Sequence, residues 1–169
     1  MHSPLAPGRR GRSAFTAAFL SLLFPGLGHA YAGAWHRALG FAAAPILLGS
    51  LVLGIVLRAD RLELLGTLLQ PSVLTGILVL DVVALAYRAV ATIDAYRVVA
   101  YLNALEASGG GRLGRPRVPY HPVSVAGLLA VLLVMSGAHV ALARYDLLAL
   151  DFVRCELSGT GEDCELGGP

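Results

Sequence analysis

Long runs of uncharged, mostly apolar residues constrain this chain more than any other feature. Residues 13–35, 38–57 and 123–143 contain no aspartate, glutamate, lysine or arginine. A helix of about 20 apolar residues crosses the hydrocarbon core of a bilayer, which is about 30 Å thick. Only 14% of the residues are charged, against about 25% in soluble domains, so polar surface is too scarce to cover these helices in water. The sequence therefore predicts an all-α integral membrane protein in contact with the lipid bilayer.

The apolar runs and the stretches between them predict five parts. We expect a disordered basic N-terminus, membrane helices that end in an amphipathic extension, a basic cytoplasmic linker, a last transmembrane helix and an acidic extracytoplasmic tail. These parts are, in order, residues 1–12, 13–106, 107–122, 123–143 and 144–169. The chain then has three or four transmembrane helices, depending on whether its first apolar run crosses the membrane.

That first run, residues 13–35, allows two arrangements. Pro25 and Gly26 should end or kink its first helix, because proline lacks a backbone donor and clashes with the preceding turn. The run either crosses the membrane fully or re-enters and leaves on the side from which it came. Non-helical backbone at membrane depth is tolerated only when it lies against protein or a wet cavity. The residues of the run alone leave both arrangements open.

Arginine placement predicts the orientation. Residues 1–12 and 108–122 hold three arginines each, and arginine-rich short segments stay in the cytoplasm. The tail, residues 144–169, has two arginines and six acidic residues and is expected outside. The re-entrant arrangement satisfies these placements, whereas four crossings would export the basic N-terminus. Cleavage of a signal peptide after Ala32 is a further alternative, but it would export the basic linker.

The string PGLGHAYAG is the most specific motif in the chain. Its turn-forming residues and its two polar aromatic side chains are Pro25, Gly26, Gly28, His29, Tyr31 and Gly33. Three glycines and a proline predict a tight, close-packed turn. We expect the histidine and the tyrosine to lie at the membrane surface.

Two strings resemble a known family. FLSLLFPGLGHAYAGAWHRALGF resembles the PGLG-x-x-Y-x-G segment of small bacterial membrane proteins related to the two-transmembrane-helix domain family, and ATIDAYRVV resembles the xxIDAYRxA stretch that often follows it. With the basic linker, one more span and an exported tail, residues 13–145 are similar to the N-terminal membrane region of some LytR-CpsA-Psr envelope proteins. Those proteins transfer glycopolymers from lipid carriers to peptidoglycan with an extracytoplasmic domain. We expect this chain to lack that domain, so the resemblance implies an anchor without a catalytic residue.

Charged residues within the third span and its extension are candidate sites. Asp81 and Arg88 lie inside the span, about 10.5 Å apart along a helix, which is too far for an easy direct pair. Intramembrane charges mark ion paths or pair with other helices, and we favour interhelical pairing here, with Arg88 reaching towards the cytoplasmic surface. Asp94 and Arg97 are three residues apart and predict a surface pair on the extension.

The only two cysteines, Cys155 and Cys164, lie in the acidic tail, in the string CELSGTGEDC. In an exported loop whose glycines allow a turn, this spacing favours a disulfide. Free thiols and a soft-metal site are the alternatives, and the metal is the less favoured one because no histidine lies nearby.

No catalytic, metal-binding or nucleotide-binding pattern is present in the sequence. Ser-His-Asp, HExxH, P-loop and dinucleotide signatures are missing, and no basic-aromatic stripe indicates nucleic-acid binding. We expect no cofactor. The prediction is a non-enzymatic module of the bacterial cytoplasmic (inner) membrane, associated with the cell envelope, that anchors or organises an envelope-biosynthesis protein or a second copy of itself. The alternatives are the membrane anchor of a LytR-CpsA-Psr-type transferase and a small transporter or channel subunit that uses Asp81.

Overall fold

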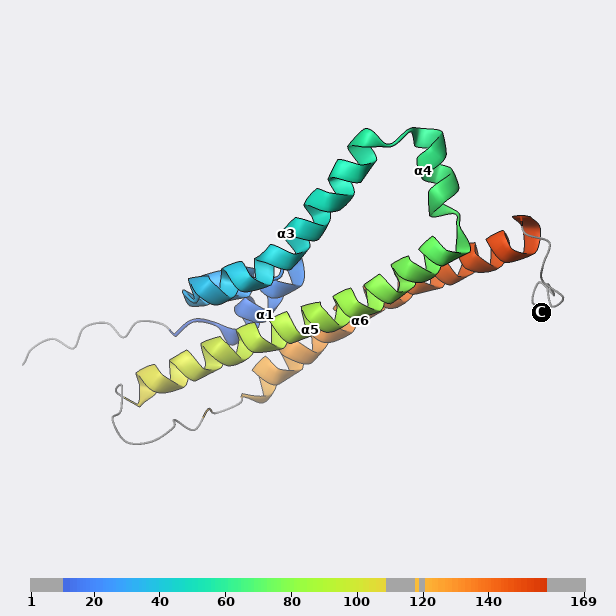
Figure 1. Ribbon diagram of the computed structural model, residues 1–169. Coiled ribbons are helices and arrows are strands. Elements are labelled where there is room, and N and C mark those ends of the chain that lie inside the picture. Colours follow the sequence, from blue (N-terminus) through green and yellow to red (C-terminus); the bar gives the residue numbers. More distant parts are fainter. Residues whose placement is uncertain (1–10, 109–117, 119–120, 158–169) are drawn as a thin grey trace, which may run out of the picture. The chain divides into compact units, whose positions relative to one another are not determined.

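The computed structural model describes residues 11–108, 118 and 121–157, and every regular element in these residues is a helix (Figure 1). The elements in chain order are α1 (Ala14–Leu23), α2 (Leu27–Ala32), α3 (Trp35–Arg58), α4 (Arg61–Leu68), α5 (Pro71–Ala107), α6 (Pro122–Phe152) and the π-helical turn η1 (Val153–Leu157). Three of them, α3, α5 and α6, are long and apolar enough to cross a membrane. The predicted all-α membrane architecture is therefore confirmed, with three such helices.

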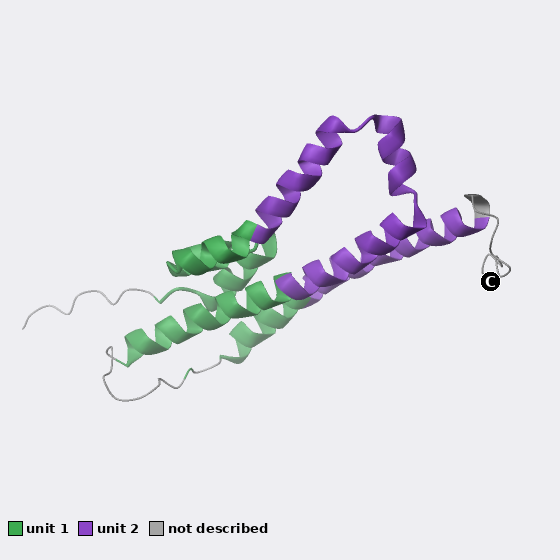
Figure 2. Ribbon diagram, in the orientation of Figure 1, with its two compact units in different colours: residues 1–43, 88–132 green, residues 44–87, 133–169 purple. Residues whose placement is uncertain are grey.

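The chain divides into two compact units (Figure 2). Unit 1 comprises residues 1–43 and 88–132, and unit 2 comprises residues 44–87 and 133–169. Unit 1 thus contains α1, α2, the beginning of α3, the second half of α5 and the beginning of α6. Unit 2 contains the rest of α3, α4, the first half of α5, and the end of α6 with η1.

In unit 1, α1 and α2 form a short helical hairpin. The Ser13 side chain caps α1 by accepting a hydrogen bond from the Thr16 backbone N–H at 3.2 Å. With ten residues, α1 is about 15 Å long, roughly half the thickness of a hydrocarbon core. The helix ends before Pro25, and Gly26 turns the chain with a φ of 101° that only glycine adopts easily. The break that the sequence predicts at Pro25-Gly26 is therefore present.

The two ends of this hairpin meet. The backbone N–H of Ser13 donates to the Tyr31 hydroxyl at 3.2 Å, and the Arg12 guanidinium donates to the carbonyl of Ala32. A segment whose beginning and end are bonded to each other returns to the place where it started. Residues 13–35 therefore have the returning geometry of the re-entrant alternative and not that of a crossing helix.

The core of unit 1 is built from small side chains. Ala17, Ala32, Ala95 and Val99 are buried together, and they bring α1, α2 and α5 into contact. Gly28 belongs to the same contact: a Cβ atom there would lie 2.1 Å from the Ala17 carbonyl oxygen and 2.9 Å from the Ala95 Cβ. Small residues at membrane helix interfaces let backbones approach closely, and this approach is what packs the hairpin onto α5.

In unit 2, α6 continues beyond the predicted end of the last span. Residues 144–152 are helical, so the last helix ends nine residues later than the sequence predicts. Leu150 is buried with Leu74 of α5 and with Val153 of η1, and this apolar contact extends the helix past the charged residues Arg144 and Asp146. The C-terminal residues 158–169 lie outside the described residues.

The packing of Gly28 predicts a large effect of one added methyl group. In Gly28→Ala the new Cβ must displace the Ala17 backbone, so we expect a loss of about 1–3 kcal/mol of stability, typical of overpacking. The control is Gly40→Ala, because a Cβ at Gly40 meets nothing within 4 Å and alanine favours a helix interior. Thermal unfolding of the purified proteins in detergent would measure both, and equal midpoints for the two variants would contradict the close contact.

Candidate functional site

The polar centre of unit 1 is the carboxylate of Asp94. His29 Nε2 of α2 lies 2.9 Å from Asp94 Oδ2. Arg37 of α3 donates through Nη1 to both carboxylate oxygens, at 3.0 Å and 3.3 Å. One side chain of α5 therefore holds two other helices, and a carboxylate with two charged or polar donors makes stronger hydrogen bonds than a neutral acceptor.

His29 is enclosed on all sides. Its relative exposure is 0%, and its ring stacks on Phe41 with a centroid distance of 4.7 Å and an interplanar angle of 18°. Because a carboxylate only accepts, Nε2 carries a hydrogen and donates it to Asp94. The other ring nitrogen, Nδ1, is buried and has no hydrogen-bond partner among the described residues.

More polar atoms are buried around the hairpin. Ser21 and Thr92 are 0% exposed, and their hydroxyl oxygens lack a hydrogen-bond partner within the described part of the chain. Arg88 donates through Nη2 to the carbonyl of Leu22 at the end of α1. That carbonyl belongs to the last turn of a helix, where no later backbone N–H satisfies it, so Arg88 caps α1 from α5.

This arrangement joins the two sequence motifs. His29 lies in PGLGHAYAG and Asp94 lies in ATIDAYRVV, 65 residues later. A histidine-aspartate pair can serve as an acid-base dyad, but His29 has no exposed surface through which it could reach a substrate. The geometry therefore fits a structural role, in which the pair of His29 and Asp94 holds the turn against α5.

His29 is fully buried within the protein, whereas Tyr31 is 36% exposed. Their position at the membrane surface stays a prediction, because burial by neighbouring side chains does not fix a depth in the membrane. One expectation about these motifs is wrong. Asp94 does not pair with Arg97: its partners are His29 and Arg37, because Asp94 faces the packed helices while Arg97 is exposed. Arg37 is a site residue that the sequence analysis missed, since no residue near it in the sequence indicates a partner 57 residues away.

The intramembrane charge of unit 2 has a partner on the neighbouring helix. Asp81 Oδ1 of α5 lies 2.6 Å from His139 Nδ1 of α6, and the two side chains are 16% and 10% exposed. This geometry agrees with interhelical pairing of Asp81. The sequence predicts that the side chain of Arg88 reaches towards the membrane surface. In the structure this side chain donates a hydrogen bond to the carbonyl of Leu22 within unit 1.

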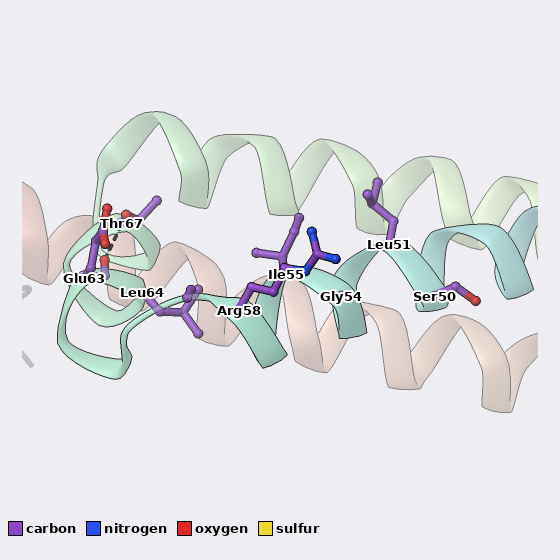
Figure 3. A pocket seen from close by; sticks show the side chains of 9 residues that line it. Ser50, Leu51, Gly54, Ile55, Arg58, Glu63, Leu64 and Thr67 are labelled. Atoms are coloured by element: carbon purple, nitrogen blue, oxygen red, sulfur yellow. Dashed lines mark hydrogen bonds between the residues drawn. The ribbon is translucent and has the colours of Figure 1, made fainter.

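A cavity of about 630 Å³ lies in unit 2 between α3 and α4, and Figure 3 shows the side chains that line it. Most of its lining is apolar, with Arg58 and Glu63 as the charged members. None of the residues that the sequence singled out lies in it.

The predicted disulfide stays a prediction. Cys155 lies in η1 and is not a free thiol, but Cys164 lies outside the described residues. In the described residues no three histidine, cysteine or acidic side chains are grouped as a metal ion would require.

Comparisons with protein-family models, with curated proteins and with solved structures found no match to this chain. The resemblance to the two-transmembrane-helix domain family and to LytR-CpsA-Psr proteins therefore remains an expectation.

The shared carboxylate predicts opposite outcomes for two neighbouring substitutions. Asp94→Ala leaves the buried Nε2–H of His29 without an acceptor, so we expect a loss of about 1–3 kcal/mol of stability. Arg97→Ala removes an exposed side chain and should change stability by no more than about 0.5 kcal/mol. Chemical unfolding in mixed micelles would measure both variants. If the two were equally destabilised, the surface pair of Asp94 with Arg97 would be the better description.

Proposed function

We propose that this chain is a non-enzymatic membrane module of the bacterial cell envelope, which anchors or organises another integral membrane protein. The observation that carries the proposal is the exposure of α3. None of the residues in its 18-residue apolar window is buried. A spanning helix that its own protein leaves so exposed offers most of its surface to lipid or to a partner helix.

The two units contribute differently to this role. In unit 1, the bonds of Asp94 and a small-residue core hold the beginning of α3 in place. Further along the helix, in unit 2, Leu47 and Leu51 are 70% and 61% exposed. They are four residues apart and therefore lie on one helix face. This face is the surface that we propose for the partner.

The crossings support the proposed orientation in the cytoplasmic membrane. With a returning hairpin and three crossing helices, the N-terminus and the linker after α5 lie on one side, and α4 and the tail lie on the other. The arginines of the N-terminus and the linker favour the cytoplasm for the first side. The tail is then outside, where its two cysteines can form a disulfide.

This orientation predicts how the cysteines react in intact cells. A membrane-impermeant maleimide should label the chain only after prior treatment with a reductant, because the thiols are outside and oxidised. The Cys155→Ser, Cys164→Ser double variant is the blank. Labelling that requires permeabilised membranes would put the tail in the cytoplasm and overturn the orientation.

The anchoring role predicts a defined neighbour for α3. A photo-reactive amino acid at Leu47 or at Leu51 should form an adduct with the same membrane protein in intact cells, because both positions share a face. The matched control is Met135 of α6, which is 2% exposed and should give no adduct.

The anchoring role also predicts that the crosslinked protein depends on this chain. Deleting this chain should lower the amount or disturb the location of the crosslinked protein, and the wild-type chain should restore it. Adducts with lipid alone at both positions, or an unaffected partner, would refute the anchoring role.

A further inference from the structure

A second polar site lies in unit 2, where α5 and α6 are in contact. Asp81 of α5 is bonded to His139 of α6, and Asp146 follows His139 by seven residues on the same helix. Residues seven apart share a helix face, two turns from each other. Asp81 and Asp146 both line a partly open cavity of about 320 Å³.

The other walls of this cavity carry no charge. They are formed by the side chains of Ile77, Leu142, Ala143, Tyr145 and Ala149. Small-molecule sites have this composition: mostly apolar and aromatic walls with a few polar groups that fix the orientation of the ligand. A volume near the lower end of the usual range of about 300–1,000 Å³ suits a small ligand.

Asp146 gives the site its specificity. Its Oδ2 atom is buried and has no hydrogen-bond partner among residues 11–108 and 121–157. Asp81 is already bonded to His139, and no arginine lines the cavity. Asp146 as a whole is only partly buried, but a carboxylate oxygen shielded from water is costly unless a donor or a positive charge accompanies it. A cation in the cavity would supply that partner.

The walls indicate which kind of cation fits. An inorganic ion needs several converging oxygen or nitrogen ligands, and the described residues contain no such group of acidic, histidine or cysteine side chains. Apolar walls with one aromatic ring suit an organic cation instead, because a ring face attracts an ammonium group.

We propose that this cavity binds a small organic cation, an amine or quaternary ammonium ion with an apolar substituent. Asp146 supplies the counter-charge, the ring of Tyr145 contacts the cationic head, and the aliphatic walls hold the substituent. This binding activity is additional to the anchoring role and does not depend on it.

Binding of benzyltrimethylammonium to the full chain in lipid nanodiscs tests the proposal, with titration calorimetry as the readout. The wild type should bind it, and Asp146→Asn should weaken binding about tenfold or more, because a shielded charge pair loses one partner. Asp151→Asn is the matched control: Asp151 lies on the same helix but is exposed, so its removal should leave the affinity unchanged.

Two further probes separate the explanations. Neopentylbenzene has the same shape without the charge and should not displace the cation; displacement would reduce the site to an apolar groove. Sodium ions should not compete, and competition by sodium would identify an inorganic cation site. Equal affinity of wild type and Asp146→Asn would also overturn the proposal. If Asp146→Asn does not fold, Ala143→Leu replaces it: the larger side chain should fill the cavity and abolish binding, and unchanged binding would refute the site.

Discussion

The carboxylate of Asp94 is the interaction on which the rest of unit 1 depends. It is bonded to His29 of α2 and to Arg37 of α3, so one side chain of α5 fixes two elements that are otherwise joined only by a short turn. The hairpin of α1 and α2 is too short to be stable alone, since isolated helices of this length are marginal. Its structure exists because Asp94 and the small-residue core hold it against α5.

Close approach of backbones makes these hydrogen bonds possible. Gly28 lies so near to Ala17 and Ala95 that even a methyl group would not fit, and this contact brings His29 within reach of α5. Between membrane helices, packing and hydrogen bonds replace the hydrophobic effect as the driving force, because lipid tails are as apolar as the side chains. The close packing of the turn glycines and the hydrogen bonds of Asp94 thus depend on each other.

The sequence predicts the crossing helices well, because the need for about 20 apolar residues is visible in residue chemistry. It places the end of α6 wrongly: Arg144 and Asp146 suggest a tail, but Leu150 packs on Leu74 and continues the helix. The partners of Asp94 could not be predicted either. They come from contacts across 57 and 65 residues, and the nearby Arg97 offered a local partner that tertiary packing does not use.

The buried hydroxyls of Ser21 and Thr92 lower the stability of unit 1. Neither hydroxyl oxygen has a hydrogen-bond partner in the described residues, and an unsatisfied buried hydroxyl costs about 1–3 kcal/mol. Valine has nearly the shape of threonine, so Thr92→Val would replace the hydroxyl by a methyl group, whereas Ser21→Ala would remove the hydroxyl and leave a small gap beside Gly28. The Thr92 position thus holds a reserve of stability that an apolar side chain of the same shape would release.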